Sequence, residues 1–431
     1  MRGDVDRRGG PVAQTAFAAA LDRRDEAAAL RLFALGAHPA FALSAEGAPV
    51  ERAAGFRMNA LLARMLERGW SPAGIAGCGA PLLAAVRSHN LEGARLLLDA
   101  GAAPPPGALR LACLRRDLPM ARLLLEHGAD PAGIVLLAWE FRDRRLLGLL
   151  AEFCADVDEA CPDTGQRALA AAAEAGDLGF AKALLAAGAD PDLPGADTQP
   201  PLAYALARRD AAFVDLLLKG GADPNTRLNT PVSESFRARF DMEDKELGYY
   251  LAKIDSGFTA LMIAAAQNDL ASARLLLKRG ARTNLLTKKW RRYPINFAVD
   301  RGHLQMAQLI VGRDPESDSR KVHIVIDLSD QRARFIQDGE VVLSTRVSTG
   351  KKGNETKPGE YLVTFKHKDH RSNLYDAPMP FFLRLSCSDF GLHEGNVPGY
   401  PASHGCIRVP KKTAEKLFGM ARLGDLVTIQ E

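Results

Sequence analysis

A short glycine-containing ending that recurs at near-constant spacing constrains the fold more than any other feature of this sequence. In its clearest form it reads Gly188-Ala-Asp-Pro191. Its copies begin at Gly36, Gly69, Gly101, Gly128, Cys154, Gly188, Gly221, Gly280 and Gly312, with successive spacings of 33, 32, 27, 26, 34, 33, 59 and 32. A period near 33 residues indicates a stack of structural repeats, none of which buries a core alone.

Each repeat reads as two short helices. In the clearest copy, Thr259-Ala-Leu261 opens an alanine-rich helix, a polar turn follows at Asn268, and a second helix carries the triplet Leu275–Leu277. The leucines would fill the seam between neighbouring repeats. The terminal glycine would adopt the left-handed conformation that ends a helix, and a following proline stops it.

This pattern resembles ankyrin repeats. It covers residues 1–315 and predicts about eight or nine repeats, of which the first and last are imperfect. A HEAT-like or other helical solenoid is the structural alternative. The resemblance implies a protein partner, because ankyrin arrays dock folded proteins more often than small molecules.

The spacing of 59 marks an insertion at residues 226–256, with four aromatic residues among many charges: Phe236, Phe240, Tyr249 and Tyr250. One hypothesis is that this segment contacts the following domain or a partner. The alternative is an excursion packed on itself at the surface.

The periodicity changes after the polar stretch Arg313–Arg320. Residues 320–431 alternate between apolar and polar positions, which predicts strands. We expect strands at 322–326, 332–336, 340–347, 361–365 and 425–429, with turns at Asp338-Gly339 and Thr356–Glu360. The fold class is therefore multidomain α+β: an all-α repeat solenoid at residues 1–315, followed by a mostly β domain at 320–431.

The chemistry-bearing stretch lies in this second domain. It reads Gly391-Leu-His393-Glu-Gly395, then a loop, then Ser403-His404-Gly405-Cys406-Ile-Arg408. A thiolate is the nucleophile of cysteine chemistry, and a nearby histidine raises the reactivity of the thiol. A glycine beside the nucleophile lets a substrate carbonyl approach the backbone N–H groups. The alternative is a cysteine packed as a small apolar residue beside two unrelated histidines.

This stretch resembles the catalytic domain of L,D-transpeptidases (YkuD type), over roughly the last 110 residues. The resemblance implies a mostly β barrel- or sandwich-like fold, a nucleophile at Cys406 and a base and later acid at His393. A third group should orient the imidazole, either the backbone carbonyl or the side chain of Glu394. Backbone N–H groups of Gly405 and Cys406, with His404, are the implied oxyanion site.

Four residues are candidates for substrate binding. Ser403 would fix the loop or touch substrate, and Arg408 would either clamp a substrate carboxylate or form an internal salt bridge. Met379, in a Met-Pro-Phe-Phe stretch, and Tyr375 are candidates for the cleft wall, with core packing as the alternative.

The resemblance further implies acyl transfer on peptidoglycan stem peptides through a thioester, giving a 3→3 cross-link. Water as acceptor would make an L,D-carboxypeptidase. The other readings are a cysteine acyltransferase on a non-peptidoglycan peptide, and an ankyrin scaffold whose catalytic domain is secondary.

Charge and composition bear on the possible partners, disulfides, cofactors and membrane segments. The net charge is +4, which gives no indication of nucleic-acid binding, and the excess of basic residues lies after residue 320. The six cysteines have no disulfide or zinc spacing, although Cys154 and Cys161 are close in sequence. We expect no metal or cofactor. We also expect no integral membrane segment, because no apolar run approaches about 20 residues.

The location of the protein stays open at this point. No signal peptide is visible in Val12–Leu21, whereas the family suggests the periplasm or cell envelope; a cytoplasmic location is the alternative.

Overall fold

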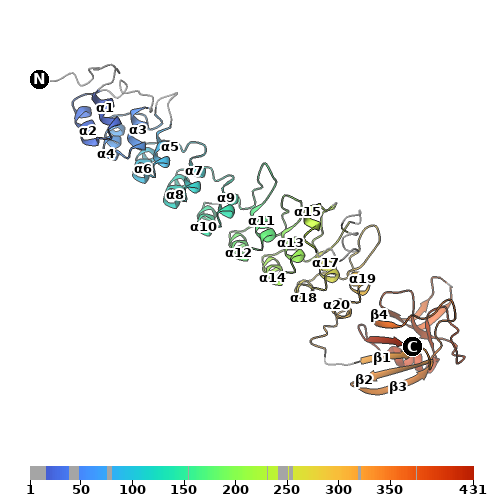
Figure 1. Cartoon of the computed structure of the whole chain (residues 1–431). Coiled ribbons are helices and arrows are strands. Elements are labelled where there is room, and N and C mark those ends of the chain that lie inside the picture. Colours follow the sequence, from blue (N-terminus) through green and yellow to red (C-terminus); the bar gives the residue numbers. More distant parts are fainter. Residues whose placement is uncertain are drawn as a thin grey trace. The chain divides into compact units, whose positions relative to one another are not determined.

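The computed structural model describes residues 16–37, 48–74, 80–153, 155–230, 232–240, 251, 256–318, 322–374 and 376–431. In Figure 1 the repeat helices run from blue to yellow and the strands are orange to red. The chain forms two compact units, Met1–Ala168 with Gly179–Ala189, and Leu169–Leu178 with Asp190–Glu431. The second unit thus contains the last repeats as well as the strands, and the expected domain boundary at 315–320 stays a prediction.

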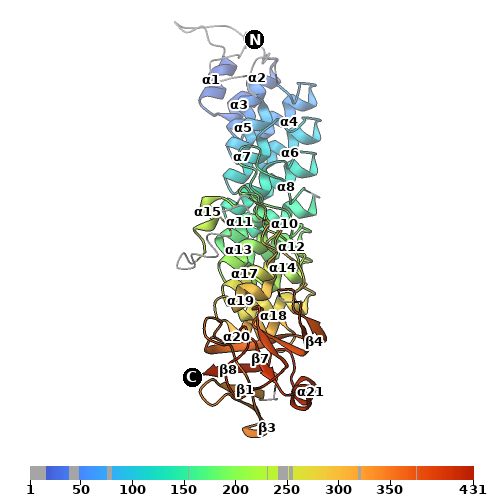
Figure 2. The same cartoon turned by 90° about the vertical axis from the view of Figure 1, so that its right-hand side faces the viewer.

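The repeats consist of helix pairs, as the period predicts. Their helices are α1 (Ala16–Asp22), α2 (Glu26–Ala34), α3 (Pro49–Gly55), α4 (Asn59–Glu67), α5 (Pro81–Arg87), α6 (Leu91–Asp99), α7 (Ala108–Leu114), α8 (Leu118–Glu126), α9 (Ile134–Glu140), α10 (Arg144–Glu152), α11 (Ala168–Ala175), α12 (Leu178–Ala186), α13 (Pro201–Ala207), α14 (Ala211–Lys219), α17 (Ala260–Ala266), α18 (Leu270–Lys278), α19 (Pro294–Val299) and α20 (Leu304–Ile310). First helices such as α3, α5 and α7 stack in one row, and second helices such as α4, α6 and α8 stack in another (Figure 2). The expected α-solenoid is confirmed. In the part of the chain that is described, no helix is long and apolar enough to cross a membrane.

Both ends of the second helices follow from sequence. The first turn is capped by an Asp or Asn side chain that accepts a backbone N–H, at Asp25, Asn90, Asp117, Asp143, Asp210 and Asp269. The glycine that ends each described repeat has φ between +81° and +101°, which other residues rarely adopt.

The insertion contains one described helix, α15 (Glu234–Arg237), which begins after the capping side chain of Ser233. Phe236 and Phe240 are buried, and the Phe236 ring packs edge-on against Tyr204 of α13. The described part therefore packs on its own repeat array. Tyr249 and Tyr250 lie outside the described residues.

The C-terminal segment is mostly β, as expected. Its strands are β1 (Val322–Asp327), β2 (Arg332–Gln337), β3 (Glu340–Arg346), β4 (Gly359–Arg371), β5 (Pro378–Leu385), β6 (Gly391–Glu394), β7 (Ile407–Val409) and β8 (Leu426–Gln430). They pair in the order β3-β2-β1-β8-β4-β5-β6-β7. β4 joins the two halves, because residues 359–362 pair with β8 and residues 363–371 pair with β5.

Several features of this domain are missing from the sequence prediction, and three of them are the strands β5, β6 and β7. The strand expected at 361–365 extends to Arg371, and a helix, α21 (Lys411–Met420), lies between β7 and β8. Lys366 of β4 donates hydrogen bonds to the carbonyls of Phe418 and Ala421 at the end of α21. This bond pattern satisfies carbonyl groups that a helix end leaves unpaired, and it holds α21 against the sheet.

Candidate active site

Two short parallel strands bring the candidate nucleophile and base together. β6 pairs with β7 in the register Leu392↔Ile407 and His393↔Arg408. Leu392 and Ile407 are almost fully buried in the core. Because side chains alternate along a strand, His393 and Arg408 face the opposite side, and so does Cys406, which directly precedes β7.

The imidazole of His393 is oriented by the backbone. Its Nδ1 lies 2.6 Å from the carbonyl oxygen of Glu394. A carbonyl only accepts hydrogen bonds, so Nδ1 carries a proton, and in the neutral imidazole Nε2 is then the nitrogen with the lone pair. The sequence left open whether the backbone carbonyl or the side chain of Glu394 orients the imidazole. In the structure, the backbone carbonyl makes this contact.

The loop before the cysteine is held by Ser403, which is 1% exposed. Its Oγ donates to the carbonyl of Cys406 and accepts the N–H of Gly405, with the latter pair 3.1 Å apart. Gly405 has φ +116°, which strongly favours glycine. The Gly405 N–H, expected from the sequence to point at an oxyanion, is therefore engaged by Ser403.

Thr356 fixes the peptide that links Gly405 to Cys406. Its buried hydroxyl donates to the Gly405 carbonyl at 2.8 Å and accepts the N–H of Gly350 at 2.9 Å. In a planar trans peptide the C=O and N–H point in opposite directions. Anchoring the Gly405 carbonyl on Thr356 therefore directs the Cys406 N–H away from Thr356.

A cavity of about 560 Å³ opens over this loop. Most of the predicted site residues line it: Met379, His393, Ser403, His404, Gly405, Cys406 and Arg408. Tyr375 lies outside the described residues, so its role stays a prediction. The sequence reading missed other lining residues, namely Asn354, Glu355, Ser372, Leu374, Asp389 and Phe390. Asn354 and Glu355 lie in a stretch, 347–359, whose glycines and hydroxyl residues indicate a loop. The other four residues have no such signal in the sequence.

Burial controls the electrostatics of Cys406. It raises the pKa of the thiol above its ordinary value, and this effect exceeds the opposing effects of a hydrogen bond from the Gly391 backbone and of the positive charge of Arg408. The thiol form is thus favoured at neutral pH.

Burial lowers the pKa of His393, whereas it raises that of Cys406. The side chain is 8% exposed, and desolvation lowers its pKa below the ordinary 6.5. The hydrogen bond to Glu394 opposes this shift, while Arg408 and His370 reinforce it. At neutral pH the pair is therefore an uncharged thiol and an uncharged imidazole, and the imidazole is available as a base.

Arg408 has no carboxylate partner among the described residues, so the internal salt bridge left open by the sequence is not observed there. The aliphatic part of its side chain lies against Gly395, where a Cβ would meet Arg408 Cγ at 3.0 Å. Arg408 lines the same cavity as Glu355 and Asp389. The cavity thus carries charges of both signs.

Comparison with known proteins agrees with this site. The model of the L,D-transpeptidase catalytic domain (YkuD) matches residues 321–429, and ankyrin-repeat models match residues 136–227 and 256–288. The chain thus carries an L,D-transpeptidase domain preceded by ankyrin repeats. No curated protein matches it.

Three similar solved structures are L,D-transpeptidases. An L,D-transpeptidase from Mycobacterium smegmatis is 21% identical, with 26% of this chain and 59% of that chain covered and a TM-score of 0.25. One from Mycobacterium tuberculosis H37Rv is 23% identical, with 26% and 58% covered and a TM-score of 0.25. One from Stackebrandtia nassauensis is 22% identical, with 33% and 80% covered and a TM-score of 0.25. The match spans under two thirds of the first two structures.

The charge of Arg408 gives a direct test of the site electrostatics. Because this charge lowers the pKa of Cys406, Arg408→Gln should raise that pKa further and slow alkylation of Cys406 by iodoacetamide several-fold at pH 8. Peptide mass spectrometry separates Cys406 from the other cysteines. The matched control is Arg371→Gln, an exposed arginine paired with Asp376 outside the cavity lining. Equal rates for both variants would contradict this assignment.

Proposed function

We propose that the chain is a cysteine-dependent L,D-transpeptidase that acts on peptidoglycan stem peptides. The observation that carries this proposal is the β6–β7 pairing, which puts Cys406 and a Nδ1-protonated His393 on one face, where both line a cavity. A thiol beside a neutral imidazole with a free lone pair is the arrangement that acyl transfer requires. The similarity to the transpeptidase domain supports the choice of substrate.

In the first half-reaction, His393 Nε2 takes the proton of Cys406 as the sulfur attacks the carbonyl carbon of the third stem residue, at its L-centre. The carbonyl oxygen becomes an oxyanion, which the Cys406 N–H stabilises. The C–N bond to the terminal D-alanine then breaks. The His393 proton passes to the leaving amine, and a thioester joins the stem peptide to Cys406.

In the second half-reaction, an amine of another stem peptide attacks the thioester carbonyl. His393 accepts the amine proton, the C–S bond breaks, and the proton returns to the sulfur as the thiol re-forms. A new amide, the 3→3 cross-link, is the product. Water in place of the amine gives a trimmed tripeptide instead.

The cavity suits a substrate that bears both carboxylate and ammonium groups. Arg408 would hold a substrate carboxylate, and a guanidinium can bind it through two hydrogen bonds. Glu355 and Asp389 provide negative charge on the same lining. Met379, which is 9% exposed, forms part of the apolar wall.

The ankyrin array would direct this chemistry to a protein partner. Such a substrate locates the enzyme in the periplasm or cell envelope, and a cytoplasmic location would point to a different acyl donor. A fusion of the native N-terminus to a reporter that matures only after export distinguishes the two.

The proposal is tested with purified disaccharide-tetrapeptide and mass analysis of products, comparing the native chain with Cys406→Ala. The native chain should release D-alanine and form dimers, and Cys406→Ala should do neither. Release of D-alanine without dimers would indicate a carboxypeptidase. An intact substrate with both proteins would contradict the proposed substrate and favour a non-peptidoglycan donor or a scaffold.

Thr356 tests the role of the Cys406 N–H. Thr356→Val removes the hydroxyl that anchors the Gly405 carbonyl while keeping the side-chain shape. Loss of one oriented oxyanion donor typically lowers the rate about 100-fold, so we expect a loss of roughly 10- to 100-fold in kcat at little changed KM. Thr345→Val, on the exposed strand β3, is the matched control. Unchanged kcat in Thr356→Val would remove this hydroxyl from the mechanism.

A further inference from the structure

The first helices of the repeats differ in how much of their surface is covered. In α5, α7 and α9, the buried residues are four of seven in each helix, and the remaining positions are accessible. In α13, all seven residues from Pro201 to Ala207 are buried. A first helix packs against its own second helix and its neighbours on one side only. All seven residues of α17, Ala260–Ala266, are buried as well. For α13, the contacts of the insertion show which segment covers the other side.

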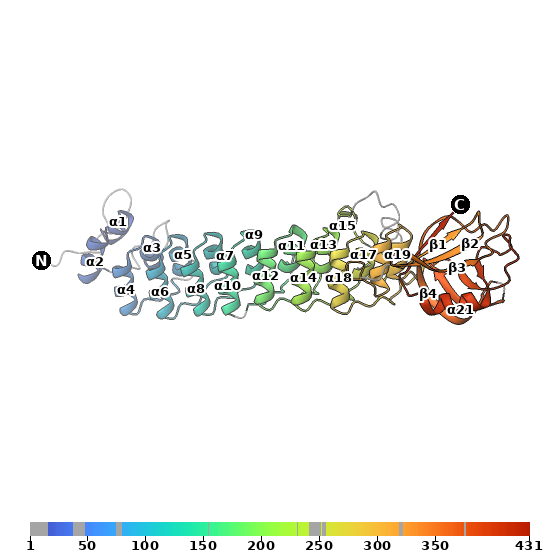
Figure 3. The ribbon, with the colours of Figure 1, turned by 90° about the horizontal axis from the view of Figure 1, so that it is seen from below.

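The insertion provides this cover through two aromatic side chains. Phe236 is fully buried, and its ring lies 5.2 Å from the Tyr204 ring of α13 in an edge-on arrangement. Phe240 is 5% exposed and lies 5.4 Å from the Phe236 ring. Figures 1 and 3 both place α15 beside α11 and α13. Aromatic pairs in this geometry add specific attraction to the area they bury.

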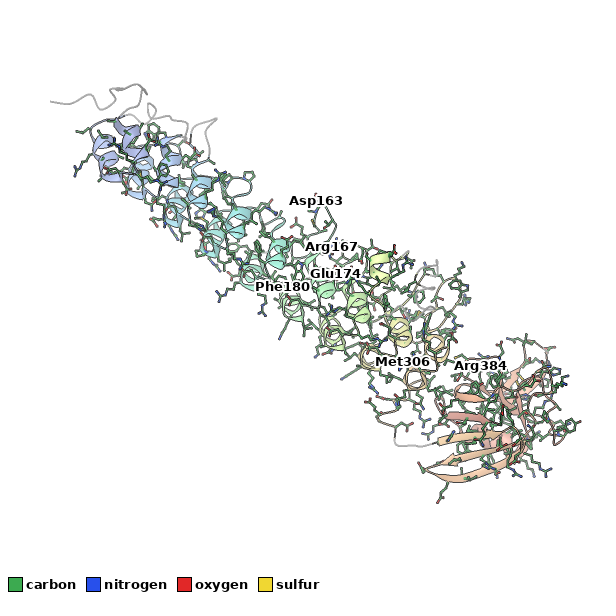
Figure 4. The ribbon with its side chains drawn as sticks, in the orientation of Figure 1. Asp163, Arg167, Glu174, Phe180, Met306 and Arg384 are labelled. Atoms are coloured by element: carbon green, nitrogen blue, oxygen red, sulfur yellow. The ribbon has the colours of Figure 1, made fainter. Side chains whose placement is uncertain are left out.

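An arginine between the aromatics adds a polar anchor. Arg239 forms an ion pair with Glu174 of α11, whose side chain Figure 4 labels, and its guanidinium lies 5.6 Å from the Tyr204 ring centre. Both partners of the ion pair remain about one third exposed. The Tyr204 hydroxyl donates to Asp197, which fixes the ring. The covered surface thus combines an aromatic ring, a carboxylate and small alanines.

The covering segment is one turn of helix. Arg239 and Phe240 donate their N–H groups to the carbonyls of Phe236 and Arg237, three residues earlier. Residues three and four apart lie on one helical face, so Phe236 and Arg239 both reach Tyr204 of α13, and Phe240 packs beside Phe236. The pattern is therefore Phe-x-x-Arg-Phe.

The base of the insertion is attached separately from this turn. Leu228 donates its N–H to the Phe258 carbonyl, and Asn229 exchanges hydrogen bonds with the buried side chain of Gln199. These bonds lie before Val232. The turn at 233–240 can therefore leave α13 while the repeat keeps its own hydrogen bonds.

We propose that Glu174, Tyr204 and the side of α13 that faces α15 form a recognition site for a helical turn of pattern aromatic-x-x-Arg-aromatic, and that residues 236–240 fill it in cis. A tethered segment competes at an effective concentration on the order of millimolar. A protein partner with the same pattern binds α13 only when this segment is displaced. The insertion thereby lowers the affinity of α13 for such a partner. This effect does not depend on the reaction that the C-terminal domain performs.

The test uses the full chain, a variant in which residues 231–255 are replaced by a short Gly-Ser linker, and a labelled synthetic peptide of residues 229–256. Fluorescence anisotropy should show binding to the deletion variant at least about tenfold tighter than to the full chain, because the cis segment blocks the site. A Phe236→Ala/Phe240→Ala peptide should bind at least tenfold more weakly. In the deletion variant, Glu174→Lys should abolish binding, and an Arg239→Glu peptide should restore it.

A second variant covers the case in which the deletion fails to fold. Phe236→Ala/Phe240→Ala in the full chain removes only the aromatic anchors, so it should also admit the native peptide. Equal binding of the peptide to the native chain and to a folded variant would overturn the proposal. So would binding that does not respond to the exchange of charges between Glu174 and Arg239.

Discussion

The pairing of two very short parallel strands is the constraint on which the candidate active site depends. β6 and β7 are four and three residues long, and their register decides which side chains meet. A shift of one residue would turn His393 and Arg408 into the core and expose Leu392 and Ile407. Burial of these two apolar side chains therefore fixes the position of the reactive ones. Gly391 keeps the third strand close, since a Cβ there would lie 2.1 Å from the Leu383 carbonyl oxygen of β5.

Burial that fixes the register also determines the protonation of the pair. Desolvation raises the pKa of Cys406 and lowers that of His393, so both shifts disfavour a thiolate–imidazolium pair in the resting state. In the proposed reaction, the proton would move as the sulfur attacks. Such a site keeps its thiol mostly protonated in the resting state. The positive charge of Arg408 opposes the rise in the pKa of Cys406 and adds to the fall in the pKa of His393. The imidazole therefore stays available as a base.

Local patterns could be predicted from the sequence, and contacts between distant segments could not. The 33-residue period gives the solenoid, the capping residues give the helix ends, and Ser403-His404-Gly405-Cys406 with His393 gives the centre of the site. Thr356 was missed as the anchor of Gly405, because the two residues are 49 apart and no periodicity relates them. The same reason hides the packing of Phe236 on Tyr204. The Gly405 N–H was predicted as a free donor, but the geometry of Ser403 engages it.

The neutral state of the pair is tested most directly by following the ring nitrogens of His393 by nitrogen-15 NMR as the pH is lowered, with His393→Gln to assign the signals. The account predicts an imidazole protonated on Nδ1 alone at pH 7, which gains its second proton only below pH 6.5, because burial lowers its pKa. A doubly protonated ring at pH 7 that loses its proton in Cys406→Ala would indicate a preformed thiolate–imidazolium pair and contradict the account.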